Sequence, residues 1–351
     1  MPRAVVVGGG PAGAASALTL LRFGWGVTLV EKSVFPRHKV CGECLSALGW
    51  AVVERLGLAD RLIESGAVRL TRAVVRPMDG EGVELALPEP MWGISRWALD
   101  AALLDAVVEA GAEVLRPARA EGVEGGDRPG VWVRGLMSNE VKRVGGDVVI
   151  LADGGATAGR WRTGDLGVKA HFRGDAGDAI ELWGLGGCYA GLSSVEGGRW
   201  CVAMSLPAAR VRERGLTRAA EEAIRTSPQL VDRLAGRERV LDWMAGPLAR
   251  HPVVERWERG VVPVGNAAAA LEPIGGEGMG LAMRSGEMAA QAIATGMDLE
   301  ELRRAYRRLW GLRRAACRAG ALVLSSPAAS SCVRWLESDW LVRGLLGAVG
   351  K

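Results

Sequence analysis

Residues 4–31, AVVVGGGPAGAASALTLLRFGWGVTLVE, contain the pattern that decides the fold. The uninterrupted apolar run at 4–7 is typical of a strand that is buried on both faces. Residues 12–23 carry mostly small and apolar side chains, which favour a helix packed closely on a sheet, and 27–30 form a second apolar strand. The stretch therefore predicts a β-α-β unit of the kind that begins a parallel, doubly wound sheet.

Three glycines follow the first strand, and each has a physical task. Gly8 allows a tight turn, Gly10 lets the backbone approach a pyrophosphate, and Gly13 lets the helix pack closely on the strand. The helix N-terminus would then point its N–H groups at the phosphates. Glu31 stands 18 residues after Gly13, where a carboxylate can accept hydrogen bonds from ribose hydroxyls. These features predict a dinucleotide site and leave NAD and FAD open.

Residues 261–286, VVPVGNAAAALEPIGGEGMGLAMRSG, favour FAD. A strand at 261–264 is followed by Gly-Asn-Ala-Ala, a proline and a second glycine-rich turn before a helix at 279–294. Two glycine turns so far apart in the chain predict a long ligand that is held at both ends. Asn266 can hydrogen-bond a ribityl hydroxyl, and the helix N-terminus would stabilise negative charge on a reduced flavin.

The rest of the chain predicts an α/β protein with two interleaved domains. The expected fold is a Rossmann-like FAD-binding domain of three layers, with a parallel sheet and an antiparallel excursion, an inserted antiparallel-sheet substrate domain and a helical C-terminus. The boundaries are 1–65, 93–160 and 251–298 for the FAD-binding domain, 66–92 and 161–250 for the substrate domain, and 299–351 for the C-terminal helical segment. The other expected elements are a loop at 33–45, helices at 46–58, 96–110, 207–236 and 299–319, short strands within 66–92, strands at 112–116 and 147–151, a three-stranded excursion at 118–145 and long antiparallel strands at 167–205.

Composition narrows the class of protein. Of 351 residues, 49% are hydrophobic and 24% charged, and the net charge of +4 is spread over mixed-sign segments, which predicts a globular protein with no nucleic-acid partner. No run of 18 apolar residues is present, so no membrane span is expected. Six cysteines without an export signal predict a cytoplasmic protein with reduced thiols. The C-terminal segment with Trp335, Trp340, Leu341 and Leu345 favours a packed amphipathic helix over a peripheral membrane contact.

Several residues have both a functional and a structural interpretation. Cys41-Gly42-Glu43-Cys44 could hold a redox pair, but a tight loop facing the flavin is favoured, and no second Cys or His pair at zinc spacing is present. The three histidines form no visible triad, so hydrolysis is unsupported. Filling of the core is the favoured explanation for the 13 tryptophans, with Trp92, Trp183 and Trp200 as candidates for an apolar pocket.

Together these motifs resemble the FAD-dependent hydroxylase superfamily of the p-hydroxybenzoate hydroxylase fold, and more closely its geranylgeranyl reductase-like branch. The matching segments are Gly8-x-Gly10-x-x-Gly13 with Glu31, Phe35-Pro36-Arg37-x-Lys39-x-Cys41-Gly42-Glu43 with Leu45-Ser46, Gly93-Ile94-Ser95-Arg96 with Leu99-Asp100, Ala152-Asp153-Gly154, Cys188-Tyr189-Ala190-Gly191, and Gly265-Asn266-Ala267-Ala268 with Pro273 and Gly278.

The resemblance implies FAD as cofactor, and NAD(P)H or a ferredoxin-like protein as electron donor, with NAD(P)H favoured. The residues expected to contact FAD are Gly8, Gly10, Pro11, Ala12, Gly13, Glu31, Lys32, Arg37, Cys41, Gly42, Arg96, Ala152, Asp153, Gly154, Gly265, Asn266, Pro273, Gly276, Gly278, Met279 and Gly280. The residues expected to line the substrate pocket are Cys44, Trp183, Tyr189 and Trp200. No metal site is expected, and no catalytic side chain stands out because the cofactor supplies the chemistry.

Two reactions on a small apolar or aromatic substrate remain open. One is hydride transfer from the flavin to a C=C bond, as the reductase-like branch implies; this is favoured. The other is hydroxylation of an aromatic or polyketide-type compound through a flavin C4a-hydroperoxide. Asn266 replaces the family's usual Asp, and Ala269 replaces a His common in aromatic hydroxylases, which weakens the hydroxylase interpretation. A halogenase tryptophan motif is not visible. A third possibility is a protein that binds FAD only structurally or senses redox state through Cys41 and Cys44.

Overall fold

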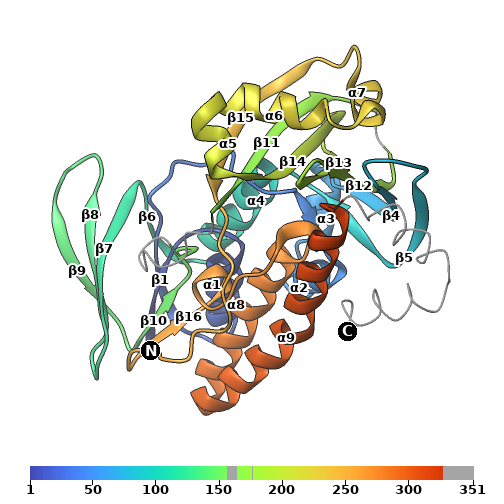
Figure 1. Ribbon diagram of the computed structural model, residues 1–351. Helices are drawn as coiled ribbons and strands as arrows, with labels where there is room; N and C mark the ends of the chain where they lie inside the picture. Colours follow the sequence, from blue (N-terminus) through green and yellow to red (C-terminus); the bar gives the residue numbers. More distant parts are fainter. Residues whose placement is uncertain (156–163, 176, 327–351) are drawn as a thin grey trace.

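A five-stranded parallel sheet is the centre of the first domain (Figure 1). The computed structural model describes residues 1–155, 164–175 and 177–326. The strands lie in the order β16 (Val261–Pro263), β10 (Val148–Leu151), β1 (Arg3–Val7), β2 (Gly26–Val30) and β6 (Glu113–Leu115). Val7 lies opposite both Leu151 and Val30, so these strands end level with one another. The predicted parallel sheet is confirmed.

Helices cover one face of this sheet. They are α1 (Pro11–Arg22), α2 (Ala47–Arg55), α3 (Ala59–Glu64), α4 (Arg96–Glu109) and α8 (Gly278–Thr295). Helix α8 lies against α1 at Gly286, whose carbonyl accepts a hydrogen bond of 3.1 Å from the Ser16 hydroxyl. A Cβ at 286 would overlap the carbonyl oxygen of Ala12. The expected helix 46–58 is observed as α2, which ends before Gly57 at φ +67°, and the short helix α3 beyond it was not expected.

The other face of the parallel sheet is covered by a three-stranded antiparallel sheet. It consists of β7 (Ala118–Glu124), β8 (Gly130–Gly135) and β9 (Val141–Gly145). Val131 and Val133 pack on the sheet valines Val5 and Val149 in one buried cluster. Helices, parallel sheet and antiparallel excursion therefore form the three layers that the sequence predicts.

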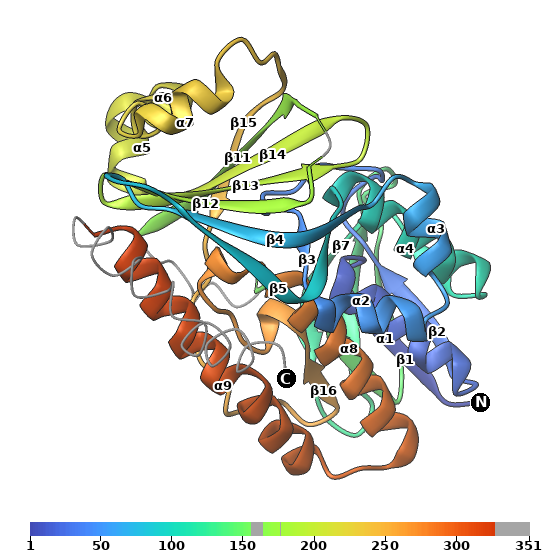
Figure 2. The ribbon, with the colours of Figure 1, turned by 90° about the vertical axis from the view of Figure 1, so that its right-hand side faces the viewer.

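An eight-stranded sheet forms the second domain. Its order is β15 (Arg239–Pro247), β11 (Asp165–Arg173), β14 (Arg199–Pro207), β13 (Cys188–Val195), β12 (Ala179–Leu185), β4 (Val68–Arg76), β5 (Val83–Gly93) and β3 (Cys44–Leu45). Figure 2 shows α5 (Ala208–Arg214), α6 (Leu216–Ile224) and α7 (Pro228–Leu234) on its outer face, with the first domain under the other face.

The second sheet differs from the prediction in three respects. It is mixed rather than antiparallel, because β4 and β12 belong to separate excursions of the chain and pair in parallel. The strand β15 was not expected, and β3 lies in the expected loop 33–45. The boundaries assigned to the two domains stay a prediction.

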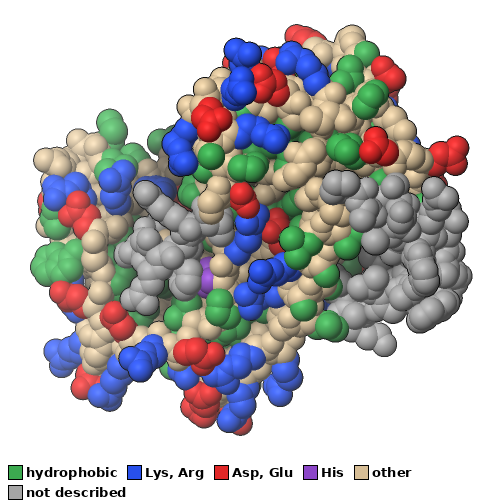
Figure 3. Space-filling view, in the orientation of Figure 1, with side chains coloured by type: hydrophobic (Ala, Val, Ile, Leu, Met, Phe, Trp, Pro, Cys, Tyr) green, Lys and Arg blue, Asp and Glu red, His purple; other side chains and the backbone are tan. Residues whose placement is uncertain are grey.

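Helix α9 (Leu299–Leu324) runs past the first domain and reaches the second sheet. It is longer than expected and buries Tyr306 and Trp310. Two short 3₁₀ turns, η1 (Gly265–Ala267) and η2 (Pro273–Gly275), precede α8. The C-terminal segment with Trp335 lies outside the described residues. Of the helices that are described, none combines the length and apolar character needed to cross a membrane. Figure 3 shows charged side chains of both signs spread over one face.

We predict that Gly286→Ala destabilises the protein. The new methyl group would meet backbone of α1, which cannot move aside as a flexible side chain would, so we expect a loss of about 1–3 kcal/mol. Urea unfolding of the FAD-loaded protein measures the loss as a lower midpoint. Gly311→Ala on α9 is the matched control: among the described residues, no atom outside the backbone of α9 lies within 4 Å of its new Cβ, and Ala should stabilise this helix by up to roughly 1 kcal/mol. Equal midpoints for Gly286→Ala and the wild type would contradict the prediction.

Candidate functional site

The predicted FAD motifs meet at one edge of the parallel sheet. Strands β1, β10 and β16 are neighbours, and the segments that follow their carboxyl ends begin at Gly8, Ala152 and Val264. Backbone hydrogen bonds tie each segment to the next strand: the amide of Gly8 donates to Val30 (2.8 Å), that of Ala152 to Val7 (2.9 Å) and that of Val264 to Leu151 (3.0 Å). Ligands of doubly wound sheets bind at this edge.

The first glycine turn can be formed only by glycine. Gly8 has φ +105°, and a Cβ there would lie 2.5 Å from the carbonyl oxygen of Ala152. A Cβ on Gly13 would overlap the carbonyl oxygen of Gly8. Helix α1 begins directly after the turn with Pro11, whose missing N–H removes no helical hydrogen bond at this position. The backbone is therefore shaped as the phosphate-binding motif predicts.

Glu31 is buried behind this turn. Its carboxylate accepts hydrogen bonds of 2.7 Å from the amides of Gly9 and Ser33, so it supports the glycine turn from below. The neighbouring Lys32 is exposed. A ribose contact of Glu31 and a cofactor contact of Lys32 stay predictions.

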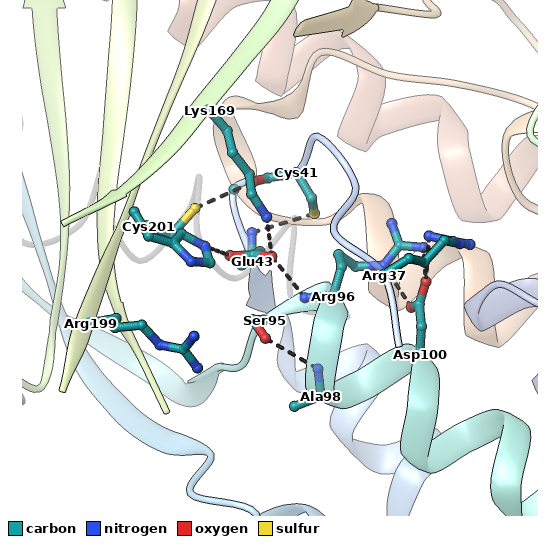
Figure 4. Close-up of polar contacts among 12 residues, drawn as sticks. Arg37, Cys41, Glu43, Ser95, Arg96, Ala98, Asp100, Lys169, Arg199 and Cys201 are labelled. Carbon is teal, nitrogen blue, oxygen red and sulfur yellow. Dashed lines mark hydrogen bonds and ion pairs between the residues drawn. The ribbon is translucent and has the colours of Figure 1, made fainter. Parts of the chain in front are cut away.

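Three cationic side chains gather at the mouth of the turn. Arg96 is buried and forms two hydrogen bonds of 2.6 Å with Asp100, and Arg37 lies 3.1 Å from the same carboxylate (Figure 4). A Cβ on Gly10 would lie 3.6 Å from Arg96 Nη2, and one on Gly154 would lie 3.7 Å from Lys39 Nζ. Asp100 and the nearby Glu31 are two acids against three cations, so this edge keeps positive charge that suits a pyrophosphate, and the residues fit FAD.

Lys39 has an electrostatic environment that favours an anion. Its side chain is accessible to solvent, yet desolvation by the surrounding protein, followed by the charges of Arg96 and Arg37, lowers the pKa of its ammonium to about 8. A phosphate beside it would relieve this repulsion.

The second motif follows strand β16 at the same edge of the sheet. Gly265 and Gly276 have φ +57° and +66°, and the backbone of Gly278 borders open space. Asn266 is exposed, and its backbone carbonyl oxygen lies 3.0 Å from Nε2 of His251. Gly280, expected against the flavin, instead lets α8 pack on α2, because a Cβ there would overlap the Ser46 hydroxyl. The side chain of Met279 packs in the core. Met279 can therefore make its predicted contact with FAD only through its backbone.

A buried ionic network joins the loop at 37–46 to the second sheet. The carboxylate of Glu43 contacts the ammonium of Lys169, lies 2.5 Å from Nε2 of His171, and accepts a hydrogen bond of 2.8 Å from the amide of Arg96 (Figure 4). The side chains of Glu43, Lys169 and His171 are at most 1% exposed. Burial alone would raise the pKa of Glu43, but the hydrogen bond of His171 and the charge of Lys169 outweigh it and lower the pKa to about 2.

Sequence reasoning named Glu43 and missed the residues that hold it. Lys169 and His171 alternate along the otherwise apolar strand β11, and this placement of polar side chains on one face was the available signal. Cys201, the partner of His171 in the adjacent strand, donates to the carbonyl of Cys41 at 3.4 Å. Ligand atoms of Glu43, His171 and Cys201 lie within 4.8 Å of one another, as a metal site requires, but Lys169 already supplies the positive charge.

The cysteines of the loop do not have the environment of a redox pair. Cys44 is buried, and desolvation strongly raises the pKa of its thiol. Its sulfur lies 4.0 Å from the sulfur of Met91 in an apolar cluster with Leu70. A reactive cysteine needs the opposite shift, toward the thiolate. The favoured interpretation, a tight loop, agrees with this environment.

The substrate-pocket prediction is wrong for two of its four residues. Tyr189 lies on the inner face of the second sheet and donates a hydrogen bond of 2.5 Å to Glu272, the residue before Pro273. Trp183 and Trp200 point to the outer face, where they pack with Ala219, Leu230 and other residues of α6 and α7. Both faces of this sheet are covered, so hydrophobicity did not reveal which way each tryptophan points. They fill a core.

We predict that Glu43→Gln destabilises the protein by about 3–5 kcal/mol, because it leaves the buried Lys169 without a counter-charge. The effect depends on pH. The pKa of Glu43 is lowered from 4.5 to about 2 in the folded state, so its contribution is complete above pH 4.5 and is lost as the pH falls toward 2. Chemical unfolding at pH 7, 4 and 3 should show this loss in the wild type and not in Glu43→Gln. The exposed Glu54→Gln on α2 is the control and should lose stability at low pH as the wild type does. If Glu43→Gln lost stability between pH 7 and pH 3 as much as the wild type, the pH dependence would not come from Glu43.

We also predict that Lys39→Gln weakens FAD binding. A hydrogen bond to a charged group contributes about 1.5–3 kcal/mol, which corresponds to a dissociation constant roughly 10–100-fold higher. Titration of apoprotein followed by flavin fluorescence measures it. Wild-type affinity should fall as the pH rises above 8, where Lys39 loses its charge, and Lys39→Gln should lack this fall. Lys142→Gln, an exposed lysine on β9, should match the wild type. Unchanged FAD affinity in Lys39→Gln would show that Lys39 does not contribute to FAD binding.

Comparison with known proteins agrees with this geometry. Residues 2–179 match the family model described as FAD binding domain. Menaquinone reductase of Mycolicibacterium smegmatis is 32% identical over 165 residues, which cover 44% of this chain and 38% of that protein. Kynurenine 3-monooxygenase of Xanthomonas oryzae is 26% identical over 320 residues, 80% of this chain and 70% of that protein. The flavin-dependent brominase Bmp2 has the same fold, with a TM-score of 0.83 at 20% identity, over 99% of this chain and 93% of the brominase.

The chain spans less than two thirds of some curated relatives that it matches: 38% of the menaquinone reductase and 64% of conditioned medium factor receptor 1 of Dictyostelium discoideum. The family match itself extends over half of the chain, and the fold is that of p-hydroxybenzoate hydroxylase-type flavoproteins. The chain therefore belongs to the family of proteins that carry this FAD binding domain.

Proposed function

We propose that this protein is an FAD-dependent oxidoreductase that reduces a C=C bond of an apolar small molecule. The observation that carries the proposal is an apolar wall beside the second FAD motif. Leu70, Met91 and Cys44 form one buried cluster, and a Cβ on Gly276 would lie 2.9 Å from the methyl carbon of Met91. A substrate on this wall would lie directly beside the loop that is expected to carry the flavin.

Bound FAD would supply the hydride chemistry, and the chain would supply position, electrostatics and exclusion of water. The wall carries no charge, because Leu70 and Met91 are apolar and the thiol of Cys44, whose pKa is raised by burial, remains protonated. Burial and the neighbouring Glu272 raise the pKa of Tyr189, so its hydroxyl also stays neutral at the edge of the wall. Neutral, apolar surroundings favour an apolar substrate over a charged one.

Relatives support both reactions that the sequence leaves open. The identity of 32% with a menaquinone reductase favours reduction. The alignment with a kynurenine 3-monooxygenase over 80% of the chain favours hydroxylation as the second candidate. We further propose NAD(P)H as the electron donor and the cytoplasm as the location; both are predictions from the sequence.

Oxygen dependence separates the two reactions. We predict that photoreduced holoenzyme, mixed anaerobically with a polyprenol, a menaquinone or kynurenine, converts one of the first two into a product with two more hydrogen atoms in a single turnover. Mass spectrometry identifies the product, and oxidised holoenzyme is the control. A product with one added oxygen atom, formed only after oxygen is admitted, would contradict the reductase proposal and support hydroxylation.

A further inference from the structure

A pocket opens beside the apolar wall. It has a volume of about 480 Å³ and lies between the inner face of the second sheet, residues 270–272 and helix α9. Tyr189 and Glu272 line it, and the next residue, Pro273, begins the turn η2 of the second FAD motif. The pocket is therefore adjacent to the loop that is expected to carry the flavin.

The charged side chains of the pocket do not cancel. Asp165 and Glu272 both pair with Arg250, at 2.6 Å and 2.5 Å. Arg314 and Arg318 on α9 also line the pocket, and no carboxylate within the described part of the chain pairs with either of them. The pocket thus holds three arginines against two acids, and both acids pair with Arg250. In Figure 3, basic and acidic side chains meet in the middle of the face, between the upper sheet and α9.

The spacing of the two arginines destabilises helix α9 when no anion is bound between them. Arg314 and Arg318 stand four residues apart on one face of α9, and like charges at this spacing repel each other. Burial and the charge of Arg318 lower the pKa of Arg314. A bound anion would neutralise both groups, and guanidinium groups match the oxygens of phosphate and carboxylate.

Part of the remaining surface of the pocket is apolar, beside the polar residues Ser205 and Ser325. Leu271, Ala321 and Leu322 lie beside the arginines, and Ala321 packs with Tyr189 and Leu324 in a cluster that extends to Leu182 of the inner face. An anionic group at the arginines would thus continue into an apolar surface that leads toward the wall described above.

We propose that this pocket binds the acidic end of an amphiphilic substrate, a phosphate or a carboxylate, while the apolar part extends toward Tyr189. Anion binding stands on the pocket alone; that the ligand is the substrate rests on the proposed function. The pocket would fix which end of the substrate faces away from the flavin loop.

Direct binding tests the proposal without turnover. Isothermal titration calorimetry of oxidised holoenzyme would use decyl phosphate, decanoate, inorganic phosphate and NADPH as probes. We expect decyl phosphate and decanoate to bind, and Arg314→Gln/Arg318→Gln to weaken both by about tenfold or more. The control is Arg304→Gln/Arg308→Gln, which removes two exposed arginines at the same spacing on α9 outside the pocket, and its affinities should stay within about twofold of the wild type.

A third variant separates the head of the ligand from its tail. Leu322→Gln should weaken decyl phosphate and leave inorganic phosphate unchanged. Flavin absorbance and circular dichroism establish that each variant is folded. Equal losses in the two double variants, or no binding of any probe to the wild type, would overturn the site. A loss confined to NADPH would assign the pocket to the electron donor and overturn the substrate assignment. Anion binding without C=C reduction would refute only the proposed function.

Discussion

The level ends of adjacent parallel strands are the constraint on which the cofactor site depends. Val7 lies opposite Leu151 and Val30, and Leu151 lies opposite Pro263, so the segments beyond them start at the same height. A slip of one residue in any strand would displace its motif by about 3.3 Å and turn its side chains to the other face. The match between the glycine turns is therefore set by the valine-rich core beneath them.

The buried ionic network around Glu43 holds the loop at 37–46 in a fixed position relative to the second sheet. Buried ion pairs contribute little net stability, because desolvation opposes the attraction of the charges. Their value is in geometry: the carboxylate of Glu43 has partners on β11 and at the start of α4, and only one placement of the loop satisfies all of them. Glu43 even holds φ +55°, a backbone conformation that non-glycine residues seldom adopt. Cys44 is the next residue, so the same network positions the apolar wall.

The features that could be read from the sequence are local. Gly8 and Gly13 are required by a turn whose geometry depends on a few neighbouring residues, and the strand that precedes them has a clear apolar pattern. The missed features depend on contacts between distant segments. Lys169 finds Glu43 across the domain boundary, β4 pairs with β12 from another excursion, and Trp200 points away from the first domain. Gly280 shows the limit of a motif: it lies within the expected pattern, yet its missing side chain serves helix packing.

The inner face of the second sheet changes character along its width, and this bears on the reaction. Near β4 and β5 it is apolar, with Leu70 and Met91. On β11 it carries Asp165, Lys169 and His171, and the arginines of the pocket come from the segment after β15 and from α9. Hydroxylation of a phenol gains from a base that removes the ring hydroxyl proton. Glu272 already accepts from Tyr189 and pairs with Arg250, but Glu277 in the second FAD motif is buried, and desolvation raises its pKa to about 7. Reduction of a C=C bond needs no such base, but it adds a proton as well as a hydride, and this proton must come from water or from a protonated side chain. An apolar chain held at its acidic end would place the bond at one fixed distance from that end beside the flavin loop, whatever the chain length, so the distance from Arg314 to the wall would select the position of reduction.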